Sequence, residues 1–145
     1  MVKINKRGLK TNRSVWKYIF FGIITLGIYD LVLIHEMARD LNRIGEGDGS
    51  KPTAGLLKCI LLSCVTLGIY WFIWIYSFQE RMADNASRYS VNVRESGAVV
   101  LLWSLLGALA LGIGPFVAMH MMLSNLNKLA KAYNQKNGLN DAETE

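Results

Sequence analysis

Asp30 is the residue of this sequence whose type and setting point most directly to chemistry. It follows Ile28 and Tyr29 within an apolar segment, and no other apolar segment of the chain contains an acid. A carboxylate in an apolar environment costs about 2.5 kcal/mol or more, so such groups commonly serve ion or proton traffic. An Asp that begins a helix can instead cap it or stabilise the positive end of its dipole. Both roles stay open for Asp30, and the candidate partners for an ion or proton role are Lys17, Lys58 and Thr25.

The soft ligands of the chain do not predict a metal site. Met119, His120 and Met122 offer thioether and imidazole groups that suit Cu(I). Neighbouring residues of a helix point to different faces, however, so this run cannot converge on one ion. Cys59 and Cys64 are five residues apart and also point to different faces of a helix. No nucleophile, base and orienting group stand together either, so we expect no catalytic set, metal or cofactor.

Long uncharged stretches must position these residues. The chain has 145 residues, of which 52% are hydrophobic, and its mean hydropathy is +0.23. Residues 59–78 and 96–127 contain no Asp, Glu, Lys or Arg. Uncharged runs of about 20 residues are typical of membrane helices. The sequence therefore predicts an all-α integral membrane protein of one domain.

Basic residues are concentrated at the start of the chain, where no acid accompanies them, whereas the later polar stretches are balanced in charge. This bias predicts a cytoplasmic N-terminus in contact with anionic lipid. The net charge of +5 does not indicate a nucleic-acid partner, because the basic excess adjoins an apolar segment and lacks interleaved aromatics. The basic residues of this segment are Lys3, Lys6, Arg7, Lys10, Arg13 and Lys17.

The tripeptide Leu-Gly-Ile occurs three times and marks an internal repeat. Its glycines, Gly27, Gly68 and Gly112, are 41 and 44 residues apart. After each glycine, apolar residues follow at offsets of seven, ten and fourteen, which is one stripe of a helix. We predict a basic segment at 1–14, a membrane domain at 15–134 with repeats at about 15–45, 56–89 and 100–133, and a polar tail at 135–145.

A break in the helix is predicted at the middle of each unit. The third copy has Gly112 and Gly114 for a helix stop and Pro115 for a first helical turn. The first two copies have Thr-Leu-Gly-Ile-Tyr instead, for which a continuous helix with one Gly is the alternative, at a cost of about 1 kcal/mol. The residues of this helix-break motif are Thr25, Gly27, Tyr29, Thr66, Gly68, Tyr70, Gly112, Gly114 and Pro115.

Two topologies are consistent with these units. Three single spans use about 20 residues each and form a small transmembrane helical bundle with amphipathic cytoplasmic extensions. Re-entrant hairpins place all three extensions on one side, which suits their shared polar pattern, and each half would reach about half of a 30 Å apolar core. We expect the three spans, with hairpins as the alternative.

The sequence Thr-Leu-Gly-Ile-Tyr-Trp-Phe-Ile-Trp at residues 66–74, together with Asp-Leu-Asn at 40–42, carries a family resemblance. It resembles the bacterial membrane-protein family catalogued as domain of unknown function 4234 (DUF4234), over roughly residues 13–90. The third copy departs from the pattern, because Leu-Gly-Ile-Gly-Pro replaces the aromatic version. The resemblance implies a multi-pass protein of the bacterial cytoplasmic membrane and carries no activity.

These features lead us to expect a non-enzymatic membrane protein. Its amphipathic helices would associate with one another, with a membrane-protein partner or with lipid, in a structural or interaction role that includes homo-oligomers. The alternative is an oligomeric channel or transporter subunit with Asp30 on its ion or proton path. In both cases the expected location is the cytoplasmic membrane.

Overall fold

The computed structural model describes residues 7–140, and this part of the chain is helical without strands. Each of the three units folds as a helical hairpin, in which a short helix, a tight turn and a longer helix follow one another. The first hairpin is α1 (Val15–Ile24) and α2 (Ile28–Ile44); the second is α3 (Leu56–Val65) and α4 (Ile69–Ala86), followed by the 3₁₀ helix η1 (Ser87–Tyr89); the third is α5 (Gly97–Leu109) and α6 (Gly114–Lys136).

Hydrogen bonds from a threonine explain why the first two units break. The Thr25 hydroxyl donates to the carbonyl of Phe21 at 2.6 Å and accepts from the amide of Tyr29 at 2.9 Å. Thr66 makes the equivalent two bonds in the second hairpin, at 2.7 and 2.9 Å. The threonine side chain thus gives a hydrogen-bond partner both to a carbonyl near the end of the short helix and to an amide at the start of the long helix. The motif Thr-Leu-Gly-Ile-Tyr is therefore a hairpin turn in this structure.

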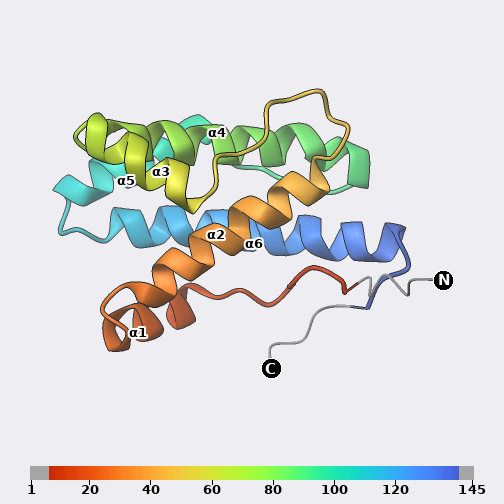
Figure 1. The fold of residues 1–145 in the computed structure, drawn as a ribbon, viewed down its shortest axis with the longest axis horizontal. Coiled ribbons are helices and arrows are strands. Elements are labelled where there is room, and N and C mark those ends of the chain that lie inside the picture. Colours follow the sequence, from red (N-terminus) through yellow and green to blue (C-terminus); the bar gives the residue numbers. More distant parts are fainter. Residues whose placement is uncertain (1–6, 141–145) are drawn as a thin grey trace.

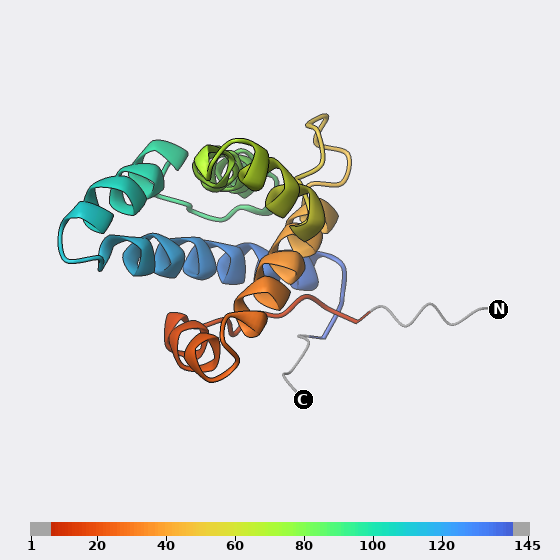
Figure 2. The ribbon, with the colours of Figure 1, turned by 60° about the vertical axis from the view of Figure 1, so that its left-hand side comes forward.

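The three hairpins close into a ring. Each short helix contacts the long helix of its own unit and that of the preceding unit: α3 lies on α2, α5 on α4, and α1 on α6. The long helices α2, α4 and α6 also contact one another. All three turns therefore lie at one end of the molecule, on the left in Figure 1, and the second view shows the same arrangement (Figure 2).

The amphipathic stripes of the long helices form the core. They face one another at the centre of the ring. The apolar stripes that we expected to bind other proteins or lipid are therefore covered by helices of the same chain. The members of these stripes that are at most 1% exposed are Met37, Leu41, Ile44, Phe78, Met82, Met122, Leu126 and Leu129.

No helix in the described part of the chain combines the length and the apolar character that crossing a bilayer requires. The predicted transmembrane bundle is therefore not supported. The physical reason is that the turns divide the apolar runs, so that α1 and α3 have 10 residues each and α5 has 13. Lys3, Lys6 and the end of the predicted tail lie outside the described residues.

The segment before α1 joins the start of the chain to its end. Asn134 of α6 holds the backbone of Leu9 from both sides, accepting from its amide at 2.7 Å and donating to its carbonyl at 2.8 Å. Asn127, two turns earlier, holds the backbone of Arg13 in the same way, at 3.1 and 2.7 Å. This extended segment therefore completes the ring along α6.

Candidate functional site

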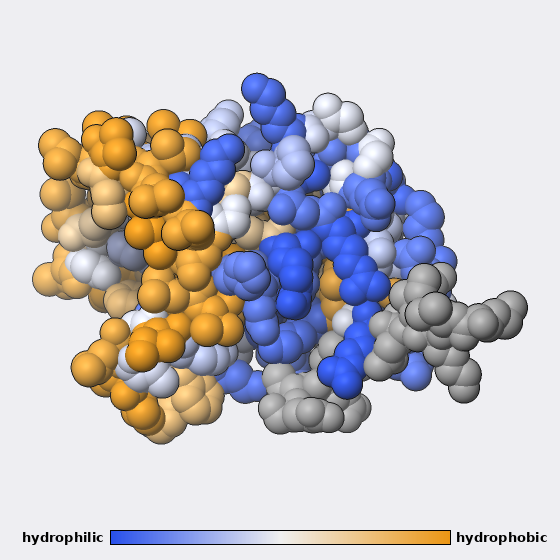
Figure 3. All heavy atoms as spheres, viewed as in Figure 1, coloured by the Kyte–Doolittle hydropathy of each residue, from blue (hydrophilic) through white to orange (hydrophobic). Residues whose placement is uncertain are grey.

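Exposed apolar side chains gather at the end of the molecule that holds the turns. Figure 3 shows this end as mostly hydrophobic and the opposite end as mostly hydrophilic on the face in view. Monomeric soluble proteins rarely expose large contiguous apolar patches, so such a surface marks a binding site. We call it the tip surface, and its most exposed turn residues are Leu26 (93%), Leu67 (94%) and Leu111 (93%), with Ile28, Ile69 and Ile113 beside them at about 60%.

The three tip leucines have an unfavourable backbone conformation. Leu26 and Leu67 have φ of 52° and Leu111 has φ of 60°, in the left-handed region where Gly or Asn is normally found. A non-Gly residue there costs on the order of 1 kcal/mol, and these side chains recover none of it through packing because they are almost fully exposed. Local stability therefore does not explain a leucine at any of the three positions.

Sequence reasoning missed these leucines as functional residues. The predicted break motif names the threonine, glycine and tyrosine of the first two turns and the two glycines and the proline of the third. The structure places Gly27, Gly68 and Gly112 at positive φ in the three turns. Gly114 and Pro115 lie in the first turn of α6, as Tyr29 and Tyr70 lie in those of α2 and α4. The available signal was that Leu, unlike Thr or Tyr, is present in all three copies.

Asp30 lies in the first turn of α2, within the tip surface. Its carboxylate packs on Gly22 of α1, where an added Cβ would come within 2.7 Å of Asp30 Oδ1. This Oδ1 atom is buried and has no hydrogen-bond partner in the described structure. Burial raises the pKa of Asp30 above its ordinary range. No ion pair joins it to Lys17 or Lys58 among the described residues.

Polar and basic side chains begin at a common depth below the tips. His35 and His120 are exposed and lie eight residues after their turn glycines, which is about 12 Å along a helix. Lys17 and Lys58, ten residues before Gly27 and Gly68, are exposed at a similar depth on α1 and α3. Apart from Asp30, the first two hairpins carry no charged side chain between this level and the tip.

The other candidates from the sequence do not come together. Cys59 is buried and Cys64 is exposed, and both are free thiols. Met119 and Met122 belong to the core, whereas His120 faces solvent. Within residues 7–140, no group of three or more His, Cys, Asp or Glu side chains is arranged to hold a metal ion.

Buried polar residues hold the linkers at the opposite end of the molecule. Asp40, Arg81 and Asn125 lie outside the apolar stripes of their helices, yet they are only 1%, 8% and 1% exposed. Asp40 forms an ion pair with Arg13, in the segment before its own unit. Asn125 donates to Glu95 Oε2 at 3.0 Å, in the linker before α5.

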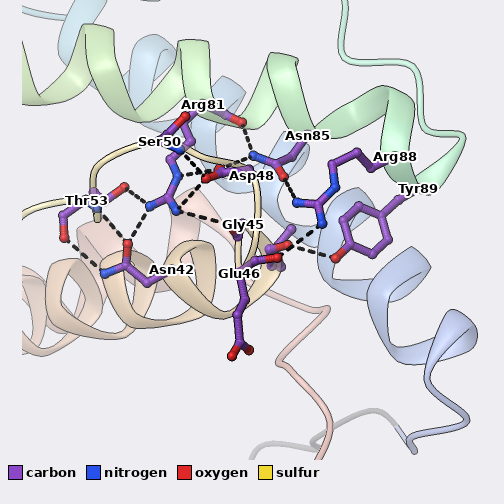
Figure 4. Close-up of polar contacts among 11 residues, drawn as sticks. Asn42, Gly45, Glu46, Asp48, Ser50, Thr53, Arg81, Asn85, Arg88 and Tyr89 are labelled. Carbon is purple, nitrogen blue, oxygen red and sulfur yellow. Dashed lines mark hydrogen bonds and ion pairs between the residues drawn. The ribbon is translucent and has the colours of Figure 1, made fainter.

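The most extensive of these contacts surrounds Arg81 (Figure 4). Its guanidinium donates to Asp48 at 2.9 Å, to Asn42 at 2.5 Å and to Thr53 at 3.0 Å. Asn42 in turn binds the backbone of Thr53 from both sides. The hydrogen bond from Arg81, with a further one from Asn85, holds the pKa of Asp48 well below its ordinary range. Because these side chains bind one another and the linker between α2 and α3, we interpret the cluster as a structural clamp on that linker.

Cations complete this polar end. Arg43, Arg88 and Lys136 lie in the last turns of α2, η1 and α6. Each donates a hydrogen bond to a backbone carbonyl, and helix C-termini favour cations. Arg43 and Lys136 border an open pocket of about 240 Å³, together with Glu46, Tyr89, Tyr133 and Asn137. Because these cations balance converging helix ends, the pocket does not need an anion to explain it.

The fold and the tip surface together define an all-α protein of three helical hairpins, with one apolar end and one polar end. The chain belongs to the family described as domain of unknown function (DUF4234), whose model matches residues 13–58 and again residues 54–128. The second match includes the third unit up to α6, although that unit lacks the aromatic version of the motif. No curated protein and no solved structure matches the chain significantly.

Proposed function

We propose that this protein is a non-enzymatic membrane protein that inserts its three hairpin turns into one leaflet of a bilayer. Its polar end then faces the cytoplasm. The observation that carries this function is the set of tip leucines, each exposed by more than 90% in a strained conformation. A hydrocarbon environment supplies the burial that these side chains lack in water, at about 1.5–3 kcal/mol for each fully buried leucine.

The dimensions of the hairpins support insertion into a single leaflet. A helix of 10 residues, such as α1 or α3, is about 15 Å long, which is half of a 30 Å apolar core. The polar level marked by His35, His120 and the two lysines then coincides with the headgroups. The backbone of the first two turns is also hydrogen-bonded internally, as a lipid environment requires.

Anionic phospholipid is the lipid class that this geometry favours. Lys17 and Lys58 are exposed at headgroup depth, and neither forms an ion pair among the described residues. Each lysine near an anionic membrane surface contributes about 1 kcal/mol to binding. The double variant Lys17→Gln and Lys58→Gln should therefore weaken binding to anionic vesicles by about tenfold or more and leave binding to neutral vesicles unchanged. Lys51→Gln with Lys131→Gln, at exposed positions on the polar end, is the matched control.

Vesicle flotation tests the insertion itself. The triple variant Leu26→Asn, Leu67→Asn and Leu111→Asn should reduce the partition coefficient for phosphatidylcholine vesicles by at least tenfold, whereas Ser50→Asn with Lys51→Asn and Lys131→Asn should not. Circular dichroism checks that both proteins keep their helices. Equal partitioning of wild type and tip variant would refute the function.

A fluorophore on Cys64 measures where the tip goes. This thiol is exposed at the end of α3, whereas the other cysteine, Cys59, is buried. A polarity-sensitive label on Cys64 should shift to the blue on addition of vesicles. The same label at Ser50→Cys in a Cys64→Ser background lies at the polar end and should not shift. A label on Cys64 that stays in a watery environment on bound protein would exclude insertion of the second hairpin.

A further inference from the structure

Asp30 is the one feature of the tip surface that leaflet insertion does not explain. The equivalent positions of the other two hairpins hold Trp71 and Pro115, which have no charge. Asp30 is three residues from Gly27, closer to the tip than the lysines and histidines are. In the inserted protein its carboxylate therefore lies on the hydrocarbon side of the headgroups.

The positive end of the α2 dipole, and no cationic side chain, is what the structure offers to offset an ionised Asp30 at this depth. Its Oδ1 atom is buried against Gly22 without a hydrogen-bond partner. On α1, the titratable side chains are Lys17, exposed at headgroup depth, and Tyr18, whose pKa is raised by burial and by the charge of Asp30.

The remaining neighbouring elements add no cation. On α2, Tyr29 is adjacent, and its pKa is also raised, chiefly by burial. Phe116 of α6 packs against Tyr18 of this hairpin, and α6 has no titratable side chain before the exposed His120. Since neither element offers a cation, an ionised Asp30 would enter the leaflet with only the dipole of α2 to offset its charge.

We infer that Asp30 takes up a proton when the first hairpin enters the bilayer, so that insertion strengthens as the pH falls. This regulation rests on the proposed leaflet insertion and adds a proton-binding site to it. Because hydrocarbon disfavours the charged form, the proton affinity of the carboxyl is higher in the inserted state than in water. Between the two pKa values, one proton is bound on insertion. The partition coefficient then rises with falling pH by up to tenfold per pH unit.

The test is the pH dependence of partitioning into phosphatidylcholine vesicles, from about pH 8 to about pH 4.5. Neutral lipid is chosen because its surface does not attract basic side chains, so binding to it reports the apolar tip and Asp30. Wild type should show at least a tenfold increase across the range. Asp30→Asn, which is nearly isosteric and cannot ionise, should bind at the acid level at every pH.

Two controls separate this carboxyl from other titrating groups. Asp84→Asn removes an exposed acid from the part of α4 that lies on the aqueous side of the headgroups. This variant should keep the pH dependence of wild type. His35→Gln with His120→Gln should also keep it. Either of two results would overturn the proton site while leaving insertion intact. One is a partition coefficient that still depends on pH in Asp30→Asn. The other is wild-type binding that requires the tip leucines but does not change with pH. Binding that is insensitive to the tip leucines would instead refute the proposed function.

Discussion

Asp40 and Arg81 carry opposite charges at the same position of two successive units, thirteen residues after the turn glycine, and both are buried. Each holds the segment that precedes its own unit, Asp40 through Arg13 and Arg81 through Asp48. Asn125 has the third equivalent position and also binds its preceding linker. In all three copies the residue at this position therefore binds the preceding segment. Its charge differs between copies because its partner in that segment differs.

Removal of the Arg81 guanidinium should strongly destabilise the protein. Arg81→Met keeps the length of the side chain but leaves Asp48, whose side chain is only 8% exposed, without its cation. Loss of one partner of a buried ion pair costs about 3–5 kcal/mol. We expect a reduction of this order in the free energy of unfolding, measured by chemical denaturation.

Arg39→Met is the control for that measurement. The Arg39 side chain also pairs with a buried carboxylate, that of Asp40, but is itself 61% exposed. Exposed ion pairs contribute about 1 kcal/mol or less. Equal destabilisation by Arg39→Met and Arg81→Met would show that the clamp around Arg81 does not contribute more than a surface pair.

Acid should weaken the fold through Asp48. The hydrogen bond from Arg81 lowers the pKa of Asp48 in the folded protein, so the unfolded chain binds its proton at a higher pH than the folded chain does. The resulting stabilisation is complete above the ordinary carboxyl range and is lost as the pH falls below about 4. Unfolding curves from about pH 7 to about pH 3 should show this loss.

Asp48→Asn should reduce the acid slope and lower the stability at neutral pH. Glu46→Gln, which changes an exposed carboxylate of the same linker, should leave the slope in place. Identical slopes for wild type and Asp48→Asn would assign acid sensitivity to other carboxylates. Glu95 is the next candidate, because the hydrogen bond from Asn125 lowers its pKa.

Replacement of a tip leucine by asparagine should not destabilise the protein in water. Leu67 is 94% exposed at φ 52°, so Leu67→Asn loses little packing and relieves backbone strain. The free energy of unfolding should stay unchanged or rise by up to about 1 kcal/mol. Leu126→Ala in the core, from 0% exposure, should by contrast cost about 2–5 kcal/mol. A marked loss of stability with Leu67→Asn would mean that the turn leucine stabilises the fold itself.

The third hairpin should not tolerate a methyl group where its helices cross. A Cβ on Gly107 would lie 2.1 Å from the Cα of Gly114, so α5 and α6 approach backbone to backbone. Gly107→Ala must therefore separate the helices, at a cost of about 1–3 kcal/mol. Gly55→Ala, at an open position with φ of −72°, should change the melting temperature little. Similar melting temperatures for both variants would contradict the close contact.

The repeat in the sequence predicts the units and the apolar stripes because both follow from local spacing. A glycine and a helical period are sufficient to locate each hairpin, and a threonine before the Leu-Gly-Ile tripeptide adds to the signal in the first two. The length of the apolar runs misleads, since the run at residues 59–78 continues through the turn at Gly68 and so describes two antiparallel helices. The turn decides whether such a run forms one long helix or two antiparallel helices, and hydropathy alone does not reveal the turn.

Burial of the polar clamps could not be predicted for a different reason. Helical periodicity gives the face on which Asp40 or Arg81 lies, but it does not say whether a linker covers that face. Arg13 and Asp48, which complete the two clamps, lie in segments without periodicity. Only the closed ring brings each linker onto its helix.

The hydrogen bonds between α6 and the segment before α1 also determine when this chain can finish folding. Leu9 and Arg13 bind asparagines that follow them by 125 and 114 residues, so all three hairpins must be synthesised before this segment can bind α6. The hairpins, made of local contacts, can form one after another during synthesis. Until α6 is made, the first helix lacks one of its two neighbouring helices. Under the proposed function, a lipid surface could cover the exposed side of this helix before synthesis ends.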